Sequence, residues 1–147
     1  MGNLSRYLQL PFTKQRLLVE STLLLLAVRI GLRILPFKTI HRFIQHGERR
    51  PIEIVHDNDA YQNEITWAIQ RTGDIRIGEH SCLPLALAGQ LQLNLHGFPA
   101  STRFGVQKTM SGELKAHAWI ECNGKVVFGG MDHEIEHYSV LSDIEGI

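Results

Sequence analysis

Two residue types that act together in thiol catalysis, a cysteine at a helix start and a histidine in a strand, occur in the second half of the chain. Cys82 opens an apolar run that ends near His96 and is predicted as a helix. A thiol in the first turn of a helix lies against unpaired backbone N–H groups and the positive end of the helix dipole, which favour the thiolate. A small core residue is the alternative interpretation of Cys82. It is the preferred one for Cys122, which has no base nearby in the sequence.

The histidine lies in a predicted β-hairpin. Residues 115–122 and 125–128 are predicted as strands, and Asn123-Gly124 separates them. An Asn-Gly pair between two such runs is typical of a two-residue hairpin turn.

A two-residue turn fixes which residues face one another in this hairpin. His117 then lies opposite Gly130, and Asp132 shares its face at a diagonal position, about 7–8 Å away. Glu121 shares the same face but lies roughly 13 Å along the strand, too far for a hydrogen bond. The pattern therefore predicts a nucleophile, a base and an orienting acid in Cys82, His117 and Asp132.

The elements that position these residues are predicted from periodicity and capping signals. Thr13 is expected to cap the first helix and Pro36 to end it, while Ser81 caps the helix that starts at Cys82. Pro84 is compatible with that helix because its third position needs no backbone donor. The predicted helices cover 13–35, 38–44, 59–73 and 81–96, and the predicted strands cover 102–107, 115–122 and 125–128. Helices followed by antiparallel strands indicate an α+β fold, with a central helix packed on a small sheet.

The 147 residues suffice for one domain, and the charge is divided unevenly within it. Residues 1–50 hold nine Lys or Arg and two acidic residues, whereas 51–147 hold six and thirteen, and the net charge is zero. We therefore expect a basic helical region at 1–50, a candidate partner-docking part, and a catalytic core at 51–147. A neutral chain gives no indication of nucleic-acid binding.

Cysteine usage and hydropathy predict a cytoplasmic protein that does not span a membrane. Two cysteines do not make a disulfide framework. The leucine-rich segment 17–35 is interrupted by Glu20, Arg29 and Arg33, so no uncharged run approaches the ~20 residues of a membrane span. Contact of this helix with a membrane surface or with a partner stays open.

Several short motifs together resemble a known family. They are Leu-Pro-Phe at 35–37, Cys-Leu and an Ala/Leu helix at 82–91, Arg-Phe-Gly-Val at 103–106, and His-Ala-Trp-Ile-Glu at 117–121. This order resembles the transglutaminase-like superfamily and, within it, the standalone leader peptidases of lasso-peptide biosynthesis. Relatives carry Asn-Asp after the hairpin, where this chain has Gly-Gly-Met-Asp at 129–132.

The resemblance implies a cysteine peptidase that cuts a ribosomally made precursor between leader and core through a thioester acyl-enzyme. Cys82 is then the nucleophile, His117 the base and Asp132 the orienting acid, and no metal or cofactor is implied. The Cys82 backbone N–H and His80 are candidates for the oxyanion site. Trp119 either lies in the substrate cleft or packs beside the histidine. A separate leader-recognition protein, docking on the N-terminal helices, and an ATP-dependent cyclase are the implied partners.

Three alternatives remain. The same triad could transfer the acyl group to an amine, or the chain could be a binding module without activity. His133, Glu134 and His137 also match the H-E-x-x-H zinc motif, with Asp143 as a possible third ligand, although Val140 replaces the glycine that lets the chain turn back. The other histidines are interpreted mainly as surface or capping residues: His41, His46, His56 and His96.

Overall fold

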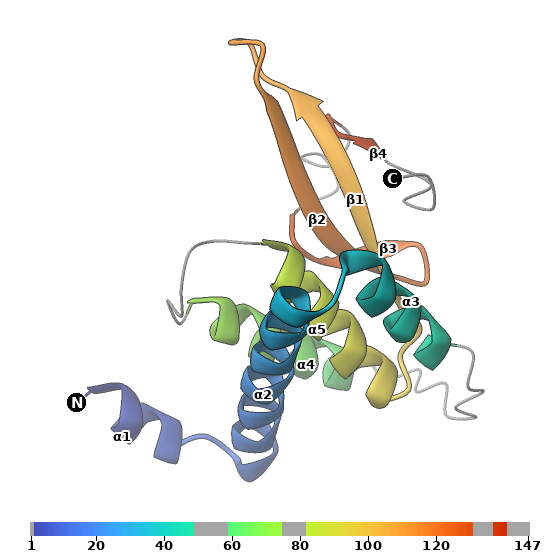
Figure 1. Cartoon of the computed structure of the whole chain (residues 1–147). Helices are drawn as coiled ribbons and strands as arrows, with labels where there is room; N and C mark the ends of the chain where they lie inside the picture. Colours follow the sequence, from blue (N-terminus) through green and yellow to red (C-terminus); the bar gives the residue numbers. More distant parts are fainter. Residues whose placement is uncertain (1, 49–58, 75–81, 131–136, 141–147) are drawn as a thin grey trace.

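Helices form the first two thirds of the chain and strands form the last third (Figure 1). The computed structural model describes residues 2–48, 59–74, 82–130 and 137–140. The helices in these ranges are α1 (Gly2–Leu8), α2 (Phe12–Ile34), α3 (Phe37–Glu48), α4 (Asp59–Asp74) and α5 (Cys82–Leu95). The strands are β1 (Ala100–Lys108), β2 (Leu114–Cys122), β3 (Lys125–Phe128) and β4 (Ser139–Val140). This order confirms the predicted α+β class.

The helix α1 was not predicted, and α3 continues to Glu48, four residues beyond its predicted end at 44. The starts of α2 and α5 were predicted with caps. α2 begins at Phe12 after Pro11, and no side chain caps it, so the prediction that Thr13 caps this helix was wrong. The fixed φ of proline, here −54°, starts the helix one residue earlier. α5 begins at Cys82 as predicted, while Ser81 lies outside the described residues.

The four strands form one antiparallel sheet in the order β3-β2-β1-β4. The turn between β2 and β3 is the predicted two-residue turn: Asn123 and Gly124 have φ values of 52° and 76°. Positive φ at both central positions is the requirement of a type I′ hairpin turn, which asparagine and glycine meet best. β4 was not predicted, because two residues carry no periodicity.

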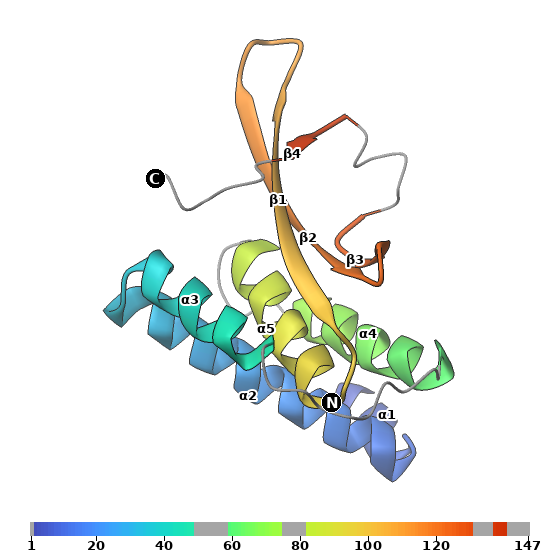
Figure 2. The same cartoon turned by 90° about the vertical axis from the view of Figure 1, so that its right-hand side faces the viewer.

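α5 is the central helix, and the sheet lies against it. Figures 1 and 2 show α2, α3 and α4 arranged around α5, with β1 and β2 crossing on its other side. Gly89 permits this close approach, since a Cβ atom there would lie 2.6 Å from Cδ1 of Ile120. The core between these layers includes Ile65, Ile69, Ala86, Leu93, Ala118 and Ile120.

α2 packs on α5 through one face only. Its buried residues are Leu17, Ser21, Leu25 and Val28, which recur every three or four positions. In the described part of the chain, no helix has both the length and the apolar character that a membrane crossing requires.

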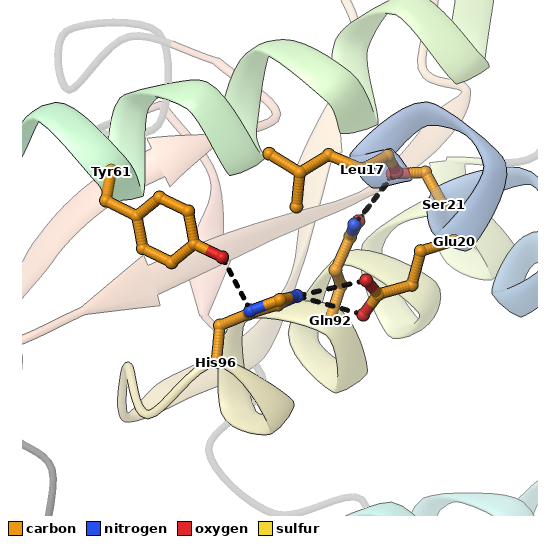
Figure 3. A network of polar contacts seen from close by, with 6 residues as sticks. All are labelled: Leu17, Glu20, Ser21, Tyr61, Gln92 and His96. Carbon is orange, nitrogen blue, oxygen red and sulfur yellow. Dashed lines mark hydrogen bonds and ion pairs between the residues drawn. The ribbon is translucent and has the colours of Figure 1, made fainter. Parts of the chain in front are cut away.

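A buried glutamine joins α5 to α2 (Figure 3). The Gln92 side chain donates a hydrogen bond to the Leu17 carbonyl at 3.0 Å and accepts one from the Ser21 hydroxyl. Gln92 is completely buried, so water cannot replace these bonds.

The Gln92→Leu variant should be less stable than the wild type by about 2 kcal/mol, because the buried Ser21 hydroxyl loses its acceptor. Urea unfolding measures this difference. The Ser21→Ala/Gln92→Leu double variant should recover part of the loss. A single variant as stable as the wild type would contradict the role of this bond.

His96, interpreted from the sequence as a surface or capping residue, follows the last residue of α5 and is partly buried. Its Nε2–H donates to the Glu20 carboxylate at 3.0 and 3.1 Å, and its Nδ1 accepts from the Tyr61 hydroxyl at 2.9 Å (Figure 3). Burial, followed by the nearby Glu20 charge, raises the pKa of the Tyr61 phenol. This polar chain ties α2, α4 and the end of α5 together.

Candidate active site

Cys82 is the first residue of α5, and its side chain is exposed. The first backbone N–H groups of a helix have no partner within the helix, so they are available to an anion or a polarised oxygen near this thiol. Pro84, at the third position, is buried and removes a donor that the helix would not use. The site thus offers an accessible sulfur beside free backbone donors.

Three hydrogen bonds fix how α5 lies along β1. The Thr102 backbone N–H donates to the Gln90 side chain at 3.0 Å, and the Thr102 hydroxyl donates to the Ala86 carbonyl at 3.3 Å. The Ala100 N–H also donates to the Asn94 side chain at 2.9 Å. Asn94 therefore lies at the start of β1 and Ala86 lies beside Thr102, so α5, followed back to its N-terminus, runs from the start of β1 towards its middle.

This alignment brings the start of α5 to the part of the sheet that carries the histidine. Cys82 lies one turn before Ala86, a step of about 6 Å, which corresponds to two residues of a strand. The same step along β1 ends at Phe104, whose partner on β2 is Ala118, the neighbour of His117. Figure 1 shows the first turn of α5 beside the lower end of the hairpin formed by β1 and β2, far from the turn that joins these strands.

The side chains of β2 alternate between the two faces of the sheet. Ala118 and Ile120 belong to the core that includes α5, so His117 and Trp119 occupy the opposite face. No hydrogen bond joins Cys82 to His117 within the described ranges. The fold thus packs the helix that begins at Cys82 on the strand that carries His117, with the His117 side chain on the face of that strand away from α5.

The backbone orients the His117 ring. Its Nε2 is hydrogen-bonded to the carbonyl oxygen of Gly129. A carbonyl only accepts hydrogen bonds, so Nε2 carries the proton, and in the neutral ring Nδ1 is left with a free lone pair. Nδ1 is therefore the atom of His117 that can take a proton.

The predicted register of the hairpin holds for only two residue pairs. Cys122 pairs with Lys125 and Glu121 with Val126, but Ile120 pairs with Phe128, so β3 has a bulge. One extra residue shifts everything beyond it, which reverses the alternation of faces.

The prediction that His117 lies opposite Gly130 was therefore wrong. With the shifted register, the position of Asp132 on the same face as His117 no longer follows from the hairpin. Asp132 itself lies outside the described residues, and so does His80.

Aromatic rings enclose His117. The ring of Trp119 lies 6.3 Å from it, centroid to centroid, and the ring of Tyr138 lies 5.5 Å away. Trp119 is completely buried, which agrees with packing beside the histidine and leaves no surface for a substrate. Gly105 makes room for this cluster, since a Cβ there would lie 2.8 Å from both aromatic residues.

A second group of polar residues holds the tryptophan. Trp119 Nε1–H donates to Glu121 at 3.0 Å, and Arg103 Nε donates to the same carboxylate at 3.2 Å. Glu121 is thus occupied away from His117, as the distance argument from sequence predicted. Sequence reasoning missed Tyr138 and Gly129 as neighbours of His117, and only the paired glycines at 129–130 hinted at special backbone geometry.

Only one residue of the possible zinc motif, His137, lies in the described part of the chain. His137 is exposed in the turn before β4, while His133, Glu134 and Asp143 lie outside the described residues. Among the residues that the structure describes, no three His, Cys, Asp or Glu side chains gather to hold a metal ion.

The two cysteines should differ in reactivity. Cys122 is 2% exposed, and burial raises the pKa of its thiol, whereas Cys82 is exposed. We expect iodoacetamide to alkylate Cys82 at least about tenfold faster than Cys122, because both access and ionisation favour it. Peptide mass spectrometry measures the two rates, and unfolding in urea should make them similar. Faster labelling of Cys122 in the folded protein would contradict the assignment.

Comparisons with known proteins identify the family of this chain. Searches of curated proteins and of solved structures gave no match. A sequence model described as Transglutaminase-like superfamily matches residues 22–143, a range that includes α5, β2 and most of α2. Since this match covers most of the sequence, the chain belongs to the transglutaminase-like superfamily.

Proposed function

We propose that the protein is a cysteine peptidase that removes the leader from a ribosomally made lasso-peptide precursor. The observation that carries the proposal is the exposed thiol of Cys82 on the first residue of α5, the helix that packs on the strand bearing His117. Membership of a superfamily that includes cysteine peptidases and acyltransferases supports this class of chemistry. The leader-peptidase role rests on the sequence motifs.

The proposed reaction has two steps. The Cys82 sulfur attacks the carbonyl carbon of the scissile bond, and His117 Nδ1 takes the thiol proton and passes it to the leaving amine. The C–N bond breaks and a thioester remains on Cys82. Water then attacks the thioester, again giving a proton to His117, and releases the leader as a carboxylic acid with the thiol restored.

In the described structure His117 lies on the face of β2 away from α5, so the reaction requires a rearrangement that brings His117 Nδ1 to the Cys82 sulfur. The Gly129 carbonyl holds the Nε2–H of His117 and leaves Nδ1 available to the thiol. Asp132 is proposed to stabilise the imidazolium that forms when Nδ1 takes the proton. Unpaired N–H groups in the first turn of α5, including that of Cys82, are proposed to bind the developing oxyanion.

Transfer to an amine is the second candidate, because the same thioester can react with either nucleophile. The test incubates the precursor peptide, a leader-recognition protein and this chain in H₂¹⁸O, with and without a small primary amine. Mass spectrometry should find a leader whose new carboxyl group carries ¹⁸O, in both conditions. A leader–amine conjugate as the main product would identify a transferase.

Two inhibitors separate thiol from zinc chemistry in the same assay. Iodoacetamide should abolish cleavage, and EDTA should leave it unchanged. Cleavage that resists iodoacetamide but is lost in EDTA would overturn the proposal and favour His133 and His137. An unchanged precursor with the complete mixture would also contradict it.

A further inference from the structure

A line of exposed apolar side chains runs along α2 on the side away from the core. Val19, Leu23, Leu26 and Ile30 are between 48% and 61% exposed. We call these four residues the outer seam. Large apolar side chains in a continuous exposed row are typical of an interaction site.

The outer seam lies opposite the buried face of α2. Val19, Leu23 and Ile30 each follow a buried residue of α2 by two positions, and two positions turn a helix by about 200°. Figure 2 shows α3, α4 and α5 together on one side of α2. The seam therefore belongs to the surface, and the core does not explain its residues.

The spacing of the outer seam is that of a coiled coil. Its four members are separated by four, three and four positions, as are the a and d positions of heptads. Two further exposed apolar residues, Ala27 and Ile34, lie at e positions beside the seam, and exposed Phe12 lies at the d position before Arg16. A single partner helix fits it best.

Two arginines bracket the seam and decide what kind of helix can bind. Arg16 occupies the a position before Val19, and Arg33 the d position after Ile30, and both are exposed. A second copy of α2 in parallel or antiparallel orientation would place arginines opposite arginines at both ends. Carboxylates at these two places would complement them.

The charge beside the outer seam is positive, like that of Arg16 and Arg33. Arg29 adds a further positive charge at its margin, and the one acidic residue of α2, Glu20, is bound to His96. In membrane-surface helices basic residues line the polar margins, whereas Arg16 and Arg33 stand in the apolar row itself.

We propose that the outer seam of α2 binds an amphipathic helix of a partner protein, with acidic residues facing Arg16 and Arg33. This inference goes beyond the proposed peptidase function and does not require it. The contact would resemble a two-stranded coiled coil along the length of α2 between the two arginines.

The test uses two synthetic helices of about four heptads, with leucine at a and d. One carries glutamate at e and g and opposite the two arginines, and the other carries lysine at the same places. Fluorescence anisotropy with the full chain should give at least about tenfold tighter binding of the acidic helix. Equal binding of both helices, or no binding of the acidic one, would overturn the proposal.

Variants localise the binding. Leu23→Glu/Leu26→Glu should weaken binding of the acidic helix by at least about tenfold. Arg16→Glu/Arg33→Glu should reverse the preference, so that the lysine helix binds more tightly than the acidic one. The matched control adds two carboxylates to exposed positions of α4, Asn63→Glu/Gln70→Glu, and should bind like the wild type. Circular dichroism confirms that each variant is folded.

Two further measurements test whether a second copy of the chain or a membrane surface binds the outer seam instead. Sedimentation of the wild type alone should show no dimer that Leu23→Glu/Leu26→Glu dissociates. Phosphatidylglycerol vesicles should not retain the wild type more strongly than this variant. A seam-dependent dimer, or seam-dependent vesicle binding without peptide binding, would replace the partner helix with a second copy or with a membrane surface.

Discussion

The Cys82→Ala variant is expected to cleave the precursor at least about a thousandfold more slowly than the wild type. Without the sulfur no thioester can form, and His117 has no thiol proton to accept. The fold should be unaffected, because the Cys82 side chain is exposed and substitutions of exposed residues rarely change stability by more than about 0.5 kcal/mol. Single-turnover cleavage followed by mass spectrometry measures the rate.

The other cysteine provides the control. Cys122→Ser should keep the cleavage rate of the folded protein while lowering its stability by about 1–2 kcal/mol, since a hydroxyl replaces a buried thiol. The two variants therefore separate activity from stability. Cleavage by Cys82→Ala at the wild-type rate, or its loss in folded Cys122→Ser, would remove Cys82 from the proposed mechanism.

The Gly129→Ala variant is expected to lose about 3 kcal/mol of stability and most of its activity. Gly129 has a φ of 95°, and a Cβ there would lie 2.8 Å from the Trp119 Cα and 2.9 Å from the Ala118 carbonyl oxygen. These are backbone atoms that cannot rotate away. The Gly129 carbonyl would move, and His117 would lose the acceptor that orients its ring.

Gly112→Ala isolates the effect of the clash. Gly112 has a similar φ of 86°, but a Cβ at this position meets nothing within 4 Å. Gly112→Ala should lower the free energy of unfolding by about 1–2 kcal/mol, the effect of the backbone conformation alone, and should leave the cleavage rate unchanged. Urea unfolding and the cleavage assay compare both variants. If Gly129→Ala were as stable and as active as Gly112→Ala, the carbonyl of Gly129 would not position His117.

Local signals were enough to predict most of the helices and strands. The Asn123-Gly124 turn and the helix start at Cys82 follow from short-range chemistry, and the structure confirms both. The bulge in β3 does not follow from such signals. It lies at Val127, between the pairs Glu121–Val126 and Ile120–Phe128, and depends on contacts between strands that no local pattern encodes.

The polar interior was also beyond prediction from sequence. His96 and Gln92 look like ordinary polar residues at the end of an apolar helix, yet both bind residues of α2 that precede them by more than 70 positions. The partner of a buried polar group depends on which helices meet. The sequence therefore predicted the elements that carry Cys82 and His117, α5 and β2, better than the contacts that hold these elements together.

The bond between Gln92 and Leu17 has a consequence for the growing chain on the ribosome. The two residues are 75 positions apart, and at about 5–20 residues per second their synthesis is separated by roughly 4–15 s. During that interval α2 has no α5 to cover its inner face, and its outer seam is apolar as well. We therefore expect the nascent protein to be a chaperone client until α5 has emerged.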